Sequence, residues 1–233
     1  MTANAVPGFQ PSRHGFHFAN RFPPGPTVRL GPIDPRRIGI GDASAGLCGG
    51  MAFTARDLFE HGMLPPPHPE PPANGTPTFR YLVRRQVHSL DWLRLPLRFW
   101  AHAALHPGAP TWWSRLLRRP PLGAHVRSVE WRRIRAEIDA GRLAQVGLLR
   151  VVGASPRSLT QNHQVLGYAY REEPGSLAVS IYDPNWPDRD DVELRMDLGP
   201  ERPVFTQSTG EPLSGFFLAP YRPAEPRAWR RPL

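Results

Sequence analysis

The feature that most constrains the fold is a change of pattern near Gly141. Before it, apolar residues recur at helical spacing in three stretches, 49–61, 79–93 and 131–138. After it come short runs rich in Val, Leu, Ile and Tyr, separated by Gly and Pro, at 143–152, 164–170, 177–182, 192–196 and 214–219. Helices first and strands later predict an α+β fold, and 233 residues suit one domain with a sizeable core.

Cys48, the only cysteine of the chain, lies at the start of the first helical stretch. A lone cysteine is usually a small, inert, buried residue, and it cannot form an intramolecular disulfide. A helix N-terminus and a nearby imidazolium, however, can lower a thiol pKa from about 8.5 to about 3.5–7.5. Cys48 is therefore a candidate nucleophile.

Two later motifs supply possible partners for this thiol. His163 lies in the sequence Gln-Asn-His-Gln-Val-Leu, and Asp183 lies in Ile-Tyr-Asp-Pro-Asn. Two apparent strands and a turn at Pro174-Gly175 separate them, and such a hairpin brings its two ends together. His163 could then share the proton of Cys48, while Asp183 fixes the tautomer and orientation of the ring.

With Gly-Leu-Cys-Gly-Gly-Met at 46–51, Asn-His-Gln-Val-Leu-Gly-Tyr at 162–168 and Tyr-Asp-Pro at 182–184, the chain resembles the papain-like cysteine hydrolases. In that fold the nucleophile opens a long N-terminal helix, and the histidine and its Asn or Asp partner follow far downstream. The closer likeness is to bacterial peptidases that cleave leader peptides for ABC transporters, whose third residue is an Asp followed by Pro. The resemblance covers about 38–217 and is carried by these three short motifs.

The resemblance implies a helical N-terminal half that contains the nucleophile helix, followed by an antiparallel sheet half. It also implies a cysteine hydrolase or acyl transferase that acts on a peptide or other acyl substrate. Cys48 would be the nucleophile, His163 the base and acid, and Asp183 the orienting residue.

One departure from the family concerns the oxyanion. Such enzymes often carry a Gln six residues before the nucleophile, and Asp42 stands there in this chain. The backbone N–H of Cys48 then needs another donor. The candidate oxyanion or orienting residues are Ser44, Gln161, Gln164, Asn162 and Asn185. If none of them serves, the chain is a catalytically inert papain-like binding module.

Stretches rich in Pro and Gly indicate how the chain is divided into segments. Residues 1–37 lack sustained periodicity and are expected to form an extended Pro/Arg-rich arm. A single papain-like domain is expected over 38–222, with a helical insertion at about 79–135 and a C-terminal tail at 223–233. The N-terminus lacks the apolar core of a signal peptide, and no apolar run reaches the roughly 18 residues of a membrane span. These features predict a cytoplasmic protein.

Positive charge is concentrated in the predicted insertion. All 29 basic residues are Arg, and 79–135 contains 12 of them against 2 acidic residues, an excess of ten charges. The insertion could be a solvated helical segment, or it could bind an anionic membrane or an acidic protein partner, which would make the chain a membrane-surface or scaffold protein. Nucleic acid is disfavoured because no nucleic-acid-binding motif is present. The candidate residues are Arg94, Arg98, Arg115, Arg118, Arg119, Trp112 and Trp113.

Two further patterns are weak candidates for metal sites. His102 and His106 have the spacing of zinc peptidases, but Ala103 stands where the general-base Glu would be. The acidic residues between Asp183 and Asp191 differ from an EF-hand in spacing and lack its terminal Glu. No metal or other cofactor is expected.

Overall fold

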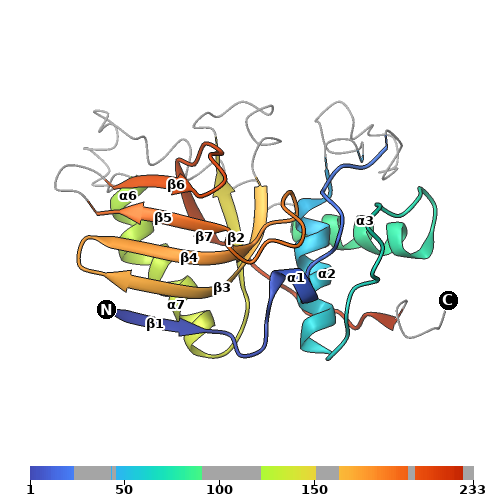
Figure 1. Cartoon of the computed structure of the whole chain (residues 1–233), viewed down its shortest axis with the longest axis horizontal. Helices are drawn as coiled ribbons and strands as arrows, with labels where there is room; N and C mark the ends of the chain where they lie inside the picture. Colours follow the sequence, from blue (N-terminus) through green and yellow to red (C-terminus); the bar gives the residue numbers. More distant parts are fainter. Residues whose placement is uncertain (24–42, 44–45, 91–121, 151–162, 199–202, 228–233) are drawn as a thin grey trace.

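The computed structural model describes residues 1–23, 43, 46–90, 122–150, 163–198 and 203–227. Helices α2 (Cys48–Glu60) and α3 (Pro77–Ser89) form a helical half at one side of the molecule. An antiparallel sheet with helix α7 (Trp131–Asp139) forms the other half (Figure 1). The chain thus mixes helices and an antiparallel sheet, as expected for the α+β class.

The two helices of the helical half pack closely because of a glycine on α2. A Cβ atom at Gly50 would lie 2.3 Å from the carbonyl oxygen of Leu82 on α3, so any larger residue would push the helices apart. The hydroxyl of Thr76 caps α3 by accepting from the N–H of Phe79 at 3.2 Å. The close contact at Gly50, in the first turn of α2, therefore fixes the position of α2 and of Cys48 relative to α3.

The sheet contains seven strands in the described part of the chain. Six follow the order β6-β5-β4-β3-β2-β7, and β1 pairs with β3 beyond the end of β2. The sheet curls into a half-barrel, since the rings of Phe205 on β6 and Phe216 on β7 lie 5.7 Å apart. The strands are β1 (Thr2–Ala5), β2 (Ala144–Leu149), β3 (His163–Glu173), β4 (Ser176–Tyr182), β5 (Glu193–Asp197), β6 (Val204–Gln207) and β7 (Gly215–Leu218).

Helix α7 packs against the sheet and supplies part of its core. Its residues Trp131, Ile134 and Ile138 are buried, and the Trp131 ring contacts Tyr170 edge-on at 5.1 Å. The helix is preceded by α6 (Leu122–His125) and a π-helical turn, η3 (Val126–Glu130). The buried carboxylate of Glu130 accepts from the backbone N–H of Leu218 at 3.0 Å, which satisfies a donor on edge strand β7.

The first 23 residues are more regular than the extended arm expected for 1–37. They include β1, which pairs with β3, and a short helix, α1 (Pro11–His14), which lies beside α2 (Figure 1). Phe16, Phe18 and Phe22 are buried in one cluster with Met51 and Leu82 of the helical half, along with Ala43, Leu47, Phe79 and Val83. Residues 24–37 lie outside the described part.

The insertion and the tail are described only in part. Of the range 79–135, helix α3 belongs to the helical half, and the segment 91–121 lies outside the described residues. The tail is described to Arg227, and its Ala224 donates to Asp57 on α2 at 3.2 Å. Among the described residues, no helix combines the length and apolarity that a membrane crossing requires.

Candidate active site

The candidate nucleophile, Cys48, is the first residue of α2 and is partly exposed. The loop before it turns through Gly46, whose φ of 89° is strained for any residue with a side chain. The residue after it, Gly49, has no room for a Cβ, which would lie 2.1 Å from the hydroxyl oxygen of Ser89. Backbone geometry on both sides therefore sets the direction in which the thiol points.

His163 is the first residue of β3 and is 3% exposed. Its imidazole is hydrogen-bonded to the side chain of Cys48. Its Nε2 lies 2.6 Å from Oδ1 of Asp183, so Nδ1 is the nitrogen left for the sulfur. The structure therefore brings Cys48, His163 and Asp183 together in a chain of contacts.

Asp183 directly follows β4 and is 1% exposed. Its Oδ1 also accepts from the backbone N–H of Asn185 at 2.8 Å, and its Oδ2 accepts from Nε2 of Gln207 on β6 at 2.8 Å. With donors on both oxygens, the carboxylate cannot rotate freely. It holds the imidazole in one orientation.

The charges in this group stabilise one another. Burial alone raises the pKa of the Cys48 thiol, but the charge and hydrogen bond of His163 and the backbone N–H groups of Gln164 and Gly49 bring that pKa below its ordinary value. Burial alone lowers the pKa of His163, yet Asp183 and Cys48 outweigh it and raise the pKa to about 10. Both shifts favour a thiolate beside an imidazolium.

The Asp183 carboxyl completes this arrangement. Burial raises its pKa, but the charge and hydrogen bond of His163, the N–H of Asn185 and the charge of Arg150 together lower the pKa below the ordinary value. Between its own lowered pKa and the pKa of His163, about 10, Asp183 is therefore ionised while His163 is protonated. The imidazolium is flanked by a negative charge on each side.

The N–H groups at the start of α2 have different partners. Those of Leu47 and Gly50 donate to Oδ1 of Asn20 at 2.6 Å and to Oε1 of Gln86 at 2.7 Å. The N–H of Gly49 contacts the Cys48 sulfur. Within the described residues, no acceptor is found for the N–H of Cys48 itself.

The predicted accessory residues have separate outcomes. The side chain of Gln164 donates to Ser89 at 3.2 Å and accepts from Gln145 at 3.2 Å, so its amide is held in a buried polar cluster. The bond to Ser89 uses one of the two hydrogens of the Gln164 amide nitrogen, so a role for Gln164 as an oxyanion or orienting residue stays a prediction. Its backbone N–H contacts the Cys48 sulfur. Asn185 contacts Asp183 through its backbone and Asn20 through its side chain.

The other predicted site residues lie outside the described part of the chain. They are Ser44, Gln161 and Asn162, which are close to Cys48 or His163 in sequence, and Arg94, Arg98, Arg115, Arg118, Arg119, Trp112 and Trp113 of the basic segment. The expectations for an oxyanion donor among the first group, and for an anionic partner of the second, stay predictions.

Two residues at the site were not anticipated from sequence. Gln207 comes from β6, a strand that the sequence pattern did not predict, and Asn20 comes from the expected extended arm. A single Asn or Gln has no spacing that marks it, so only the approach of distant segments identifies these residues. The one local signal is Gly46, because a glycine just before a nucleophile indicates a tight turn with a close neighbour.

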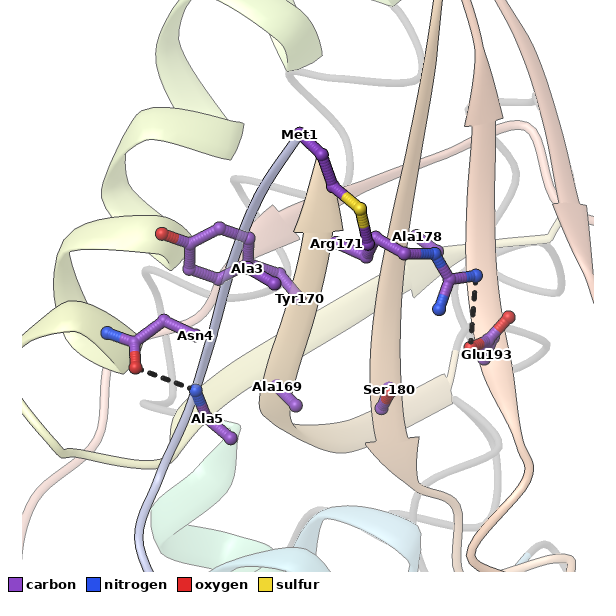
Figure 2. Close-up of a pocket in the computed structure, with 10 residues that line it drawn as sticks. All are labelled: Met1, Ala3, Asn4, Ala5, Ala169, Tyr170, Arg171, Ala178, Ser180 and Glu193. Atoms are coloured by element: carbon purple, nitrogen blue, oxygen red, sulfur yellow. Dashed lines mark hydrogen bonds and ion pairs between the residues drawn. The ribbon is translucent and has the colours of Figure 1, made fainter. Parts of the chain in front are cut away.

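A separate pocket of about 440 Å³ lies on the exposed face of the sheet (Figure 2). Small residues from β1, β3 and β4, such as Ala3, Ala169 and Ala178, line much of it, and Arg171 and Glu193 form an ion pair of 3.8 Å at one side. No residue of the triad contributes to this pocket. This pocket is therefore separate from the candidate active site.

Comparison of the chain with protein-family models, curated proteins and solved structures found no match. In the described residues, no group of three or more His, Cys, Asp or Glu side chains could hold a metal ion. A partly exposed thiolate can attack an electrophilic carbon, and a buried imidazolium beside it can donate a proton.

Proposed function

We propose that the chain is a papain-like cysteine hydrolase or acyl transferase that acts on a peptide or other acyl substrate. One observation carries the proposal. A partly exposed sulfur, at the start of a helix, contacts a buried imidazole whose other nitrogen is 2.6 Å from a buried carboxylate. The pKa shifts of the thiol and the imidazole both favour the thiolate–imidazolium pair that nucleophilic catalysis needs.

In the acylation step, the Cys48 thiolate attacks the carbonyl carbon of the substrate and forms a carbon–sulfur bond. The carbonyl oxygen becomes an oxyanion, and the N–H of Cys48 is the donor proposed to stabilise it. His163 then donates its Nδ1 proton to the leaving group as the bond between carbon and the leaving atom breaks. The products are a thioester on Cys48, a neutral imidazole and the protonated leaving group.

In the second step, His163 accepts a proton from the incoming nucleophile, which attacks the thioester carbon. The carbon–sulfur bond breaks, and Cys48 returns to the thiolate beside an imidazolium. Water as the nucleophile gives hydrolysis, whereas an amine or alcohol gives acyl transfer. The same residues serve both outcomes, and access to the site decides between them.

The pKa directions define the pH range of this mechanism. As pH falls through the lowered pKa of Cys48, the nucleophile is protonated and the rate falls. As pH rises through the pKa of His163, about 10, the proton needed by the leaving group is lost. A plot of kcat/KM against pH should therefore be bell-shaped, with its acid limb below the ordinary thiol pKa.

The test is the reactivity of the thiol. Iodoacetamide should alkylate Cys48 at pH 6, and His163→Ala should reduce that rate because it removes the imidazolium that lowers the thiol pKa. His68→Ala, at an exposed histidine, is the control and should match the unaltered protein. Equal rates at pH 6 in the unaltered protein and His163→Ala would favour the inert binding module.

A second measurement separates an enzyme from a merely reactive thiol. An activated acyl ester should transfer its acyl group to Cys48, and mass spectrometry should detect the thioester in the unaltered protein but not in Cys48→Ala. The thioester should then decay in water or transfer to an added amine. A thioester that forms and never decays would contradict the second step.

A further inference from the structure

The N-terminal segment 15–23 runs between the two halves of the molecule at the candidate active site. Phe16 and Phe22 are buried in the core of the helical half, at 0% and 6% exposure. The backbone of the same segment bonds to the sheet half, where the Phe16 N–H donates to the hydroxyl of Tyr182 at 3.2 Å. The segment is thus anchored on both sides.

Asn20 lies between these anchors. It bonds to the loop before Cys48 and to the loop after Asp183. Its Oδ1 accepts from the N–H of Leu47 at 2.6 Å, in the loop before the nucleophile. Its Nδ2 donates to Oδ1 of Asn185 at 3.2 Å, and its backbone N–H donates to the carbonyl of Pro184 at 2.9 Å, in the loop after Asp183.

The neighbouring backbone is shaped around this side chain. A Cβ at Gly46 would lie 2.6 Å from Nδ2 of Asn20, and the positive φ of Gly46 brings that loop against the amide. On the other side, the N–H of Asn185 donates to the carboxylate of Asp183. One side chain therefore connects the residue before the nucleophile to a residue that holds the orienting carboxylate.

We infer that Asn20 is a positioning residue. By bonding to both loops, it holds Cys48 and Asp183 at the distance at which the imidazole of His163 contacts both. The inference rests on the proposed function, since it concerns how the same triad is held. Replacing the amide removes the bonds to Leu47 and Asn185, whereas the backbone N–H of Asn20 bonds to Pro184, in the loop after Asp183. If the distance between the loops changed by a fraction of an ångström, the contact between Cys48 and His163 would weaken. This contact stabilises the thiolate.

The experiment compares Asn20→Ala, Asn185→Ala and the double variant by alkylation of Cys48 across pH. Each single variant should raise the apparent pKa of Cys48 and lower the alkylation rate at pH 6, by about tenfold for a shift of one pKa unit. Since both substitutions remove the same bond, the double variant should lose less than the product of the two single losses.

Ser12→Ala is the matched control, because Ser12 lies in the same N-terminal region and bonds to the same loop through Asp190, away from the triad. It should leave the pKa of Cys48 unchanged. Thermal unfolding of all variants shows whether the fold survives, and only folded variants enter the comparison. If Asn20→Ala does not fold, Asn185→Ala, which leaves the bond to Leu47 intact, carries the test.

The outcomes separate the inference from the proposed function. If Cys48 of the unaltered protein is unreactive at pH 6, the proposed function fails. If Cys48 is reactive and depends on His163, but the folded Asn20→Ala and Asn185→Ala variants keep the thiol pKa of the unaltered protein, the inference alone is overturned. Independent effects of the two substitutions would also overturn it, since the shared bond would then not be the cause.

Discussion

Helix α2 is associated with two buried carboxylates, one at each end, and they differ in what their partners can do. Asp57 and Asp183 are 0% and 1% exposed. Asp57 pairs with the guanidinium of Arg85, whereas Asp183 pairs with the imidazole of His163. A guanidinium does not release its proton in proteins, but an imidazole does. Both carboxylates are buried and paired. Under the proposed function, the difference is that Asp183 has a partner that exchanges protons, His163, and that this partner lies beside the partly exposed Cys48.

The Asp57 pair is enclosed by further donors. The carboxylate accepts from the hydroxyls of Tyr221 at 2.6 Å and Tyr81 at 3.1 Å, and from the N–H of Ala224 at 3.2 Å. Burial nonetheless outweighs these donors and Arg85, and the pKa of Asp57 is raised. The cluster fastens the C-terminal segment to α2 and leaves no reactive group exposed.

The largest expected effect comes from breaking the structural pair with Arg85→Met. The substitution leaves Asp57 buried without its compensating charge, and the loss of one partner of a buried pair costs about 3–5 kcal/mol. The free energy of unfolding, measured in urea, should fall by that amount. Within the folded protein, the pKa of Cys48 from alkylation should stay unchanged, because the triad does not depend on this pair.

Arg84→Met provides the control on the same helix. Arg84 is exposed, and its substitution should change the free energy of unfolding by no more than about 0.5 kcal/mol. Equal losses for the two arginines would mean that the Asp57 pair contributes no more than a surface charge does.

The next largest effect is expected at the other carboxylate, with Asp183→Asn. The amide keeps the shape of the side chain but removes the negative charge that raises the pKa of His163, so that pKa should fall below about 10. The imidazolium then deprotonates at lower pH, and the pKa of Cys48 should rise. NMR titration of the imidazole and alkylation across pH measure the two changes.

Asp183→Asn should cost less stability than Arg85→Met, about 1.5–3 kcal/mol for weakened hydrogen bonds to a charged group. The two variants should thus show opposite profiles, one losing mainly stability and the other mainly thiol reactivity. An Asp183→Asn protein with unchanged imidazole titration would remove the basis of the comparison.

These contrasts also show which parts of the site can be read from sequence. The triad residues stand in motifs at the start of a helix and at the ends of a hairpin, where local pattern places them. Arg85, in contrast, counts in the sequence as one of 12 arginines of a basic segment, although the structure buries it at 1% exposure. Charge density along a chain does not distinguish a solvated arginine from one paired in the core.

The same limit applies to the strands. The central strands β3 and β4 were predicted because their apolar residues are buried and their turn is local. β1 has the sequence Thr-Ala-Asn-Ala with every residue exposed, and it is a strand only because it pairs with β3 about 165 residues later in the chain. β6, which carries Gln207, pairs with the preceding strand β5, but it has only four residues and only one of them is buried, so no apolar run marks it in the sequence.

A smaller effect is expected from Gln207→Leu. The substitution removes the donor to Oδ2 of Asp183 and leaves the contact with His163 in place. It also removes the buried Oε1 of Gln207, for which the described residues supply no hydrogen-bond partner, so part of the cost is offset. The free energy of unfolding should fall by about 1 kcal/mol, and the rate of Cys48 alkylation at pH 6 should fall less than in Asp183→Asn. A larger loss of reactivity than in Asp183→Asn would assign the orienting role to Gln207.

The smallest expected effect is on the pH dependence of the free energy of unfolding. In acid, the two carboxylates should contribute to it with opposite signs. Asp183 has a lowered pKa, so its contribution to stability is present above the ordinary value of 3.8 and is lost as pH falls through its folded pKa. Asp57 has a raised pKa, so the folded protein binds its proton first, and the stability linked to this group increases as pH falls toward 3.8.

The free energy of unfolding should be measured from pH 7 to pH 3 for the unaltered protein, Asp183→Asn and Asp57→Asn. Relative to the unaltered protein, the deficit of Asp183→Asn should shrink on acidification and that of Asp57→Asn should grow. The same sign for both would mean that the two carboxylates are held alike, and that the identity of the partner, Arg85 or His163, does not separate their roles.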